Sequence, residues 1–290
     1  MNDAARPAKR DVRRAFDRAA PTYDGAAVLQ REIGARLAEH LDPIRLAPAR
    51  VLDLGCGTGH AFAELRRRYP ASHLVGLDLA PAMLRLARER TPWWRRAVGG
   101  APALACADAE RLPFAAASVQ LVFSNLALQW CDPARVFAEG ARVLDVGGLV
   151  AFSTFGPDTL KELRAAFAEA DGAPHVNDFA DMHDLGDALV AAGFADPVME
   201  MEVVRLEYTS AQAVARELKA LGAVNSLPGR SRGLPGRARW RRMEAAYERL
   251  RQGGLLPATF EVLYGHAWKV APKRTAEGHA IVRLDRRGPR

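Results

Sequence analysis

The sequence predicts an α/β fold, a doubly wound and mostly parallel sheet of seven strands with helices on both faces. Short apolar runs alternate with segments of helical periodicity, and most of these runs are apolar at successive positions, as buried parallel strands require. The strand candidates are RVLDL, HLVGLDL, ALACAD, VQLVFSN, GGLVAFSTF, PVMEMEVVRLEY and TFEVLYGHAW. The first helices between them are AFAELRRRY, PAMLRLARER and PARVFAEGARVL.

The same pattern divides the chain into five segments. Residues 1–45 are expected to form an N-terminal helical segment that covers the functional site. This segment is expected to be interrupted at Pro21 and so to consist of two helices. The α/β core follows, and then a helical insertion over the strand ends after the fifth strand. Two strands and a basic helix complete the domain before a basic tail that we expect to be mobile. These later segments are residues 46–156, 157–195, 196–270 and 271–290.

Composition limits the classes of function. The 290 residues hold 41 Lys and Arg against 34 Asp and Glu, a formal charge of +7, which favours an acidic partner or reflects a solvated surface. Cys56, Cys106 and Cys131 are too few and too scattered for a disulfide framework or a zinc site, so no metal is expected. No apolar run of about 18 residues and no secretion signal is visible. We therefore expect a cytoplasmic protein with no membrane association.

A glycine-rich loop follows the first strand in VLDLGCGTGH, residues 51–60. A P-loop would need Lys and then Ser or Thr after the last glycine, but His60 follows it. A dinucleotide loop has a different glycine spacing, and its pyrophosphate would be repelled by Asp53, which stands just before this loop. The carboxylate of Asp53 would instead attract a cofactor that carries a cationic ammonium group.

Two further acids end the next two strands, Asp78 in GLDLA and Asp108 in CADAERLPF. The carboxyl ends of parallel strands meet at one edge, which is where doubly wound sheets bind ligands. Asp78 can accept both hydroxyls of a ribose. This arrangement resembles the class I S-adenosylmethionine-dependent methyltransferases, and the resemblance places Asp108 near the adenine amino group. The expected cofactor contacts are Asp53, Gly55, Cys56, Gly57, Gly59, Asp78, Leu79, Met83, Asp108, Ala109, Asn125 and Leu126.

Three side chains are candidates near the reacting methyl. The resemblance places Gln129 and Trp130 of SNLALQWC beside the sulfonium, although Trp130 is equally well explained as a helix-packing residue. Tyr23 could fold back over the cofactor or simply pack between two helices. Methyl transfer from a sulfonium is a direct displacement, so it requires no covalent nucleophile. A carboxylate acceptor is ionised at pH 7 and needs no general base.

The second half of the sequence indicates which chemical group accepts the methyl. SNLALQWC, FSTFGPDTLKELR, HVNDF, LKALGAVN and YGHAW resemble the malonyl-acyl-carrier-protein O-methyltransferases of biotin synthesis, over residues 16–268. That resemblance implies methylation of the free carboxylate of a malonyl thioester, which hides its charge from fatty-acid elongation enzymes. Packing, structural hydrogen bonds and solvation are the alternative explanations of these candidate side chains. The residues that could orient this carboxylate are Tyr23, Gln129, Trp130, His175, Asn177, Lys219 and Arg230.

Arginines concentrate between residues 230 and 251, eight of them against two glutamates. A basic face of this kind would steer an acidic acyl carrier protein. We do not expect nucleic acid, because few aromatics are interleaved and no RNA-binding module is recognisable. A small-acid carboxyl methyltransferase, an RNA methyltransferase and a non-catalytic assembly factor remain as alternatives. The predicted docking residues are Arg237, Arg239, Arg241 and Arg242.

Overall fold

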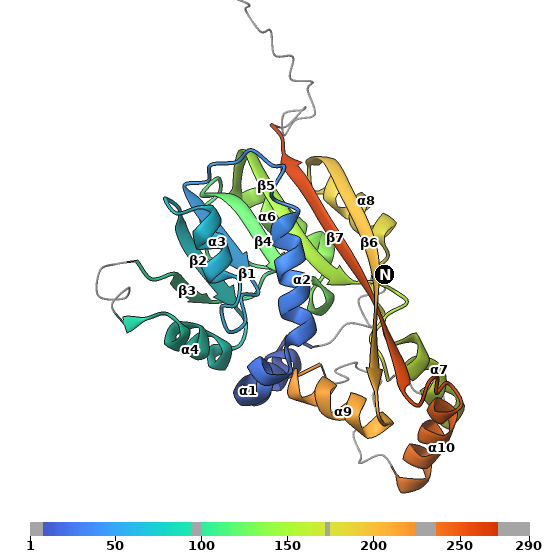
Figure 1. Cartoon of the computed structure of the whole chain (residues 1–290). Coiled ribbons are helices and arrows are strands. Elements are labelled where there is room, and N and C mark those ends of the chain that lie inside the picture. Colours follow the sequence, from blue (N-terminus) through green and yellow to red (C-terminus); the bar gives the residue numbers. More distant parts are fainter. Residues whose placement is uncertain (1–7, 94–99, 172–174, 224–235, 272–290) are drawn as a thin grey trace, which may run out of the picture.

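The computed structural model describes residues 8–93, 100–171, 175–223 and 236–271, and a seven-stranded sheet forms the centre of this part of the chain (Figure 1). The strand order is β3-β2-β1-β4-β5-β7-β6. The predicted fold class is therefore confirmed. The strands are β1 (Arg50–Leu54), β2 (His73–Asp78), β3 (Ala103–Cys106), β4 (Val119–Asn125), β5 (Leu144–Phe155), β6 (Phe194–Tyr208) and β7 (Leu256–Lys269).

The direction of the strands fixes the position of the site. β1 pairs in parallel with β2 and β4, β2 with β3, and β4 with β5. β7 is antiparallel to both of its neighbours, β5 and β6. The chain builds outward from β1 to β3 on one side and then returns to β4 on the other, so the strand order reverses between β1 and β4. Ligands of doubly wound sheets bind outside the carboxyl ends of the strands at such a point.

Helices cover both faces of the sheet. Phe123 of β4 packs with α2 and α3 on one face, whereas Val122 packs with α6 and α8 on the other. Burial on both faces explains why the central strands are apolar at successive positions. None of the helices among the described residues combines the length and the apolar character needed to cross a bilayer. The covering helices are α2 (Val28–Glu39), α3 (Phe62–Arg68), α4 (Pro81–Arg90), α6 (Pro133–Val143) and α8 (Met182–Ala191).

β6 and β7 project beyond the rest of the sheet. β7 pairs with β6 over residues 256–269 but with β5 only over residues 262–268. The projecting end carries α7 (Lys161–Ala170), α9 (Ala211–Ala220) and α10 (Arg237–Glu248), which are grouped below the sheet in Figure 1. The predicted insertion therefore divides into two parts. α7 packs on α10 and β7, whereas α8 buries its apolar side against α6 and β6 and is an ordinary covering helix.

The first helix, α1 (Lys9–Ala26), lies at the carboxyl edge and packs against α4 and α9. The predicted break at Pro21 is wrong, because the helix continues through this residue and turns only at Ala27. A proline inside a helix removes a hydrogen bond and costs roughly 3 kcal/mol. Pro21 is exposed, and burial of apolar side chains on the opposite side offsets that cost. The buried residues of α1 are Val12, Ala15, Ala19 and Ala20.

Candidate active site

A cleft lies at the carboxyl edge, with the strand-end loops on one side and α1 covering the other. Most of the predicted cofactor contacts line it: Gly55, Gly57, Asp78, Leu79, Met83, Asp108, Ala109, Asn125 and Leu126. Tyr23 lines it from α1, as the lid interpretation expects. The α1 residues Lys9, Val12 and Phe16 also line it and were not predicted.

Three glycines shape the loop after β1, and all have positive φ, which favours glycine. Beside Gly57 the space that a side chain would fill is open, so a ligand can approach the backbone there. A Cβ at Gly59 would instead lie 2.6 Å from the Phe62 ring, so this glycine serves helix packing. Three of the predicted cofactor contacts, Asp53, Cys56 and Gly59, do not line the cleft. Cys56 is buried.

Asp53 and Asp78 form a pair of acids below the loop. Asp53 is 2% exposed, and its Oδ2 atom has no hydrogen-bond partner among the described residues. Burial, together with the charge of Asp78, raises the pKa of Asp53 to about 8. Burial also raises the pKa of Asp78 to about 6, although its oxygens accept hydrogen bonds from Gly57 N at 2.9 Å and Ala80 N at 2.8 Å. A cationic group bound at this edge would lower both pKa values and supply the missing partner.

Asp108, which is predicted to lie near the adenine amino group of the cofactor, forms an ion pair with Lys9 of α1. Lys9 Nζ lies 3.1 Å from Asp108 Oδ1 and 2.7 Å from Glu110 Oε1. Lys9 Nζ is also 3.3 Å from the sulfur of Cys131. The beginning of α1 is therefore tied directly to the loop after β3.

The end of β4 is held from two sides by Asn125. Its Nδ2 donates to the carbonyl of Gln30 at 2.9 Å, and its Oδ1 accepts from Ser153 Oγ at 2.7 Å. The next residue, Leu126, has a positive φ of 51°, which costs roughly 1 kcal/mol or more outside glycine. Such local strain commonly marks functional sites, and this turn brings the β4 loop to the cleft.

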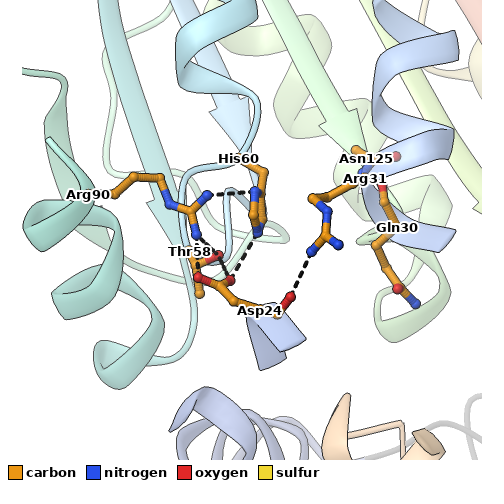
Figure 2. Close-up of polar contacts among 7 residues, drawn as sticks. All are labelled: Asp24, Gln30, Arg31, Thr58, His60, Arg90 and Asn125. Carbon is orange, nitrogen blue, oxygen red and sulfur yellow. Dashed lines mark hydrogen bonds and ion pairs between the residues drawn. The ribbon is translucent and has the colours of Figure 1, made fainter. Parts of the chain in front are cut away.

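The other end of α1 is tied to the glycine loop by the Asp24 cluster, defined as Asp24, Thr58, His60 and Arg90 (Figure 2). Asp24 Oδ1 accepts from Thr58 Oγ1 at 2.6 Å and from His60 Nε2 at 2.9 Å, and Asp24 pairs with Arg90. Arg90 Nη1 lies 2.6 Å from His60 Nδ1. Guanidinium has only donors, so Nδ1 is the acceptor and Nε2 carries the proton. Arg31 adds a bond to the Asp24 carbonyl at 2.7 Å.

Electrostatics in the Asp24 cluster favour a neutral histidine and an ionised acid. Burial and the charge of Arg90 lower the pKa of His60 despite the opposing effect of Asp24. Burial opposes ionisation of Asp24, but the hydrogen bond from Thr58 and the charge of Arg90 lower its pKa overall. Together with Lys9, this cluster ties α1 over the cleft at both ends.

A second chamber adjoins the cleft at Trp130, which lines both cavities. We define it by Gln129, Trp130, Leu163, His175, Asn177 and Leu218, with further apolar walls from β5, α7 and β7. Trp130 also packs edge-on against Phe16 of α1, at 5.3 Å between ring centroids, so packing and cavity-lining roles coincide. Four of the predicted substrate-orienting residues thus meet here.

Two of the remaining predicted substrate-orienting residues, Lys219 and Arg230, are not among the described residues that line the second chamber. Lys219 is exposed on α9 and lines neither cavity, because it points away where its neighbour Leu218 faces the second chamber. Arg230 lies outside the described residues, as do most of the predicted arginine-rich loop and the tail. Among the described residues, no three His, Cys, Asp or Glu side chains are grouped as metal ligands.

Two predicted docking arginines form contacts with α7 and the residue after it. Arg239 Nη1 pairs with Asp171 Oδ2 at 2.8 Å, and Asp171 Oδ1 lies 2.7 Å from His175 Nε2. Arg242 donates from Nη2 to the carbonyl of Ala170 at 2.9 Å and so caps the end of α7. Arg239 and Arg242 therefore also hold α10 against α7, and their docking roles remain predictions. Arg237, Arg241 and Arg242 are exposed, whereas Arg239 is partly buried.

Sheet order, glycine loop and strand-end acids together define a class I S-adenosylmethionine-dependent methyltransferase. Residues 52–152 match the family model described as a methyltransferase domain. The solved structure of the YcgJ protein from Bacillus subtilis has the same fold, with a TM-score of 0.56 and 17% identity over 83% of this chain and 99% of that chain.

Relatives that match the chain over its full length identify the family within this class of methyltransferases. The chain is 56% identical to the malonyl-[acyl-carrier protein] O-methyltransferase of Laribacter hongkongensis, over the whole length of both chains. It is 52% identical to the protein of that name from Gallionella capsiferriformans, over 95% of this chain and 96% of that one. The chain belongs to the malonyl-[acyl-carrier protein] O-methyltransferase family.

Proposed function

We propose that the protein transfers a methyl group from S-adenosylmethionine to the free carboxylate of a malonyl group on an acyl carrier protein. The observation that carries this proposal is full-length identity above 50% to the two relatives of that name. The geometry supports it, because the second chamber reaches the cleft at the point where Gln129 and Trp130 would border the methyl.

The residues of the cleft, together with the buried Asp53 beneath the glycine loop, fit the cofactor in three respects. Asp53 offers a buried carboxylate oxygen in need of a partner, which suits the ammonium group. Asp78 keeps unused lone pairs that suit ribose hydroxyls, and the carboxylate of Asp108, which pairs with Lys9, offers an acceptor for the adenine amino group. When bound, the cofactor supplies an electrophilic methyl on a sulfonium. Tyr23 and α1 cover it and exclude water.

The acceptor side needs orientation and no proton transfer. Neither Gln129 nor Trp130, beside the junction of the two cavities, is ionisable at neutral pH. An ionised carboxylate is already a nucleophile, so a junction without a base is sufficient for ester formation. Alignment of the carboxylate with the methyl, in a site closed to water, supplies the rate enhancement. The ester hides the charge of the malonyl group from elongation enzymes.

For the partner we propose docking of an acidic carrier protein on the exposed arginines of α10, Arg237 and Arg241. Their support is exposure and a charge that complements an acidic surface. For location we propose the cytoplasm, because Cys56, Cys106 and Cys131 are all free thiols, as a reducing compartment maintains them.

Intact-protein mass spectrometry tests the proposal. Malonyl-acyl-carrier protein is incubated with the enzyme and S-adenosylmethionine, beside free malonate and an RNA pool. We expect one methyl on the carrier-linked malonyl group, removed by mild ester hydrolysis. Methylation of free malonate alone would instead identify a small-acid methyltransferase. No methylation of any malonyl species by a preparation that binds the cofactor would reject the proposal.

A further inference from the structure

The described part of the second chamber's wall carries almost no charge. Of its thirteen described wall residues nine are apolar, and the four polar ones are Gln129, Thr159, His175 and Asn177; none of the thirteen is Lys, Arg, Asp or Glu. A free dicarboxylic acid would lose the hydration of both charges here, and the described wall offers no cation to replace it. The chamber therefore suits a long uncharged chain whose single charged end reaches the junction at Trp130.

Three of the four polar side chains are already engaged. Gln129 donates to the Leu126 carbonyl at 2.7 Å and accepts from Thr154 Oγ1 at 3.3 Å. Thr159 Oγ1 exchanges hydrogen bonds of 3.1 Å with the backbone of Glu261. His175 Nε2 lies 2.7 Å from Asp171 Oδ1, and its ring stacks on Phe167 with centroids 3.9 Å apart.

Asn177 is different. Its Oδ1 is buried without a hydrogen-bond partner in the described part of the chain. The adjacent backbone carbonyl is satisfied by Arg164 Nη2 at 3.2 Å, so the segment is fixed while the amide oxygen remains unpaired. Leaving a buried acceptor unpaired is costly, and a ligand that donates to it would remove that cost.

We propose that the second chamber receives the prosthetic arm of the carrier-bound thioester, with Asn177 Oδ1 accepting a hydrogen bond from an amide N–H of the arm. The arm is a flexible chain of methylene and amide groups that ends in the thioester, so its surface is mostly apolar with a few donors. This proposal rests on the proposed function, since it names the part of the same substrate that lies behind the carboxylate.

The proposal changes the role expected for Asn177. A carboxylate has only acceptors, so an unpaired amide oxygen repels it and cannot orient it. An acceptor on the wall instead selects an amide-bearing arm and sets how far the malonyl group reaches toward the junction. Asn177 Oδ1 thus positions the acceptor through the arm and does not itself bind the reacting carboxylate.

The first test replaces Asn177 with leucine, which has similar volume and no acceptor. Two small substrates are compared: malonyl-N-acetylcysteamine, which contains one amide, and the malonyl thioester of methanethiol, which contains none. We expect Asn177→Leu to raise KM for the first substrate about tenfold and to leave the second unchanged. Because the change removes an unpaired buried acceptor, Tm should be equal to or above that of the wild type.

A matched pair on α9 provides the second test. Leu218 faces the second chamber, whereas the next residue, Lys219, is exposed. Leu218→Trp should abolish methylation of malonyl-carrier protein, and Lys219→Trp should have no effect. Binding of S-adenosylhomocysteine, measured by calorimetry, should be unchanged in both variants, because neither residue lines the cleft.

The outcomes separate this proposal from the proposed function. Wild-type enzyme that methylates no malonyl thioester refutes the function itself. With an active wild type, an equal rise of KM for both small substrates in Asn177→Leu, or normal carrier methylation by Leu218→Trp, overturns the arm assignment alone.

Discussion

The cleft and the second chamber share Trp130 but are built in different ways. Apart from the α1 residues and Met83 of α4, the cleft is lined by strand ends and the segments after them, within residues 55–131. The second chamber draws on residues 129–260, brought together by α7, α9 and the projecting end of β7. Strand ends place a side chain at the sheet edge by topology alone, whereas a wall assembled from distant helices depends on packing.

Among the changes considered, Gly57→Val should have the largest effect on binding of the cofactor in the cleft. A side chain would enter the space reserved for the cofactor, and we expect affinity for S-adenosylhomocysteine to fall about 100-fold or more in calorimetry. Gly147→Val is the control, because Gly147 also has a positive φ and open surroundings but lies outside the cleft. Equal loss of affinity in both would point to strain rather than to the loop contact.

Asp53→Asn should produce the next largest effect. The pKa of Asp53 is about 8 in the ligand-free protein and about 3.9 in an unfolded chain, so the folded state binds the extra proton between these values. Ligand-free stability should therefore fall as pH rises from about 4 to 8, and Tm measurements of the variant should show a weaker decline. Affinity for S-adenosylhomocysteine should fall about tenfold at pH 8, because the amide offers no charge to the ammonium.

Asp145→Asn is the matched control for that variant. Asp145 pairs with Gln120 and does not line the cleft. It should leave both the pH dependence and the affinity unchanged. An unaltered pH dependence in Asp53→Asn would show that Asp53 does not titrate in this range.

Reversing the charge of two exposed arginines tests how the acceptor reaches the second chamber. The double change Arg237→Glu and Arg241→Glu should lower kcat/KM for malonyl-carrier protein about tenfold at low salt, with a smaller effect at high salt. Malonyl-N-acetylcysteamine should be used normally. Arg239→Glu, by contrast, places a carboxylate against Asp171 and should lower Tm. Salt-independent loss on both substrates would contradict docking on α10.

Asp24→Asn should have the smallest effect. The side chains are partly exposed, so we expect a loss of about 1 kcal/mol in stability and a several-fold faster release of S-adenosylhomocysteine by stopped-flow fluorescence. Since the pKa values of both Asp24 and His60 are lowered, the contribution of the cluster is present at neutral pH and is lost as pH falls. Glu32→Gln, in an exposed pair with Arg36, should leave the release rate unchanged.

The sequence was most informative about the cofactor side. Asp78 and Asp108 were predicted at the sheet edge because each was expected to end a strand, and Asn125 was predicted from the family resemblance; all three line the cleft. Tyr23 was predicted as a residue that could cover the cofactor, but Lys9, Val12 and Phe16 were missed, because the helix was expected to break at Pro21. These residues keep one helical phase with Tyr23 across Pro21, so their periodicity carried the signal.

The acceptor side was harder to predict for a physical reason. A run of arginines indicates positive charge but does not distinguish a solvated side chain from one that caps a helix or pairs with a distant acid. Arg239 and Arg242 depend on residues 170 and 171, far away in the chain. His175 and Asn177 were found through family resemblance, whereas the unpaired oxygen of Asn177 is visible only in three dimensions.

Contact between α1 and α9 has a consequence for the kinetic order of the reaction. Thr22 Oγ1 donates to the carbonyl of Ala220 at 3.0 Å, close to Leu218 and Ala223 of the second chamber wall. We expect a filled second chamber to brace α9, and through this contact to slow the movement of α1 away from the cleft. We expect an ordered sequential mechanism in which S-adenosylmethionine enters first and S-adenosylhomocysteine leaves last. Product-inhibition patterns should then be competitive for that cofactor pair and mixed against the carrier substrate.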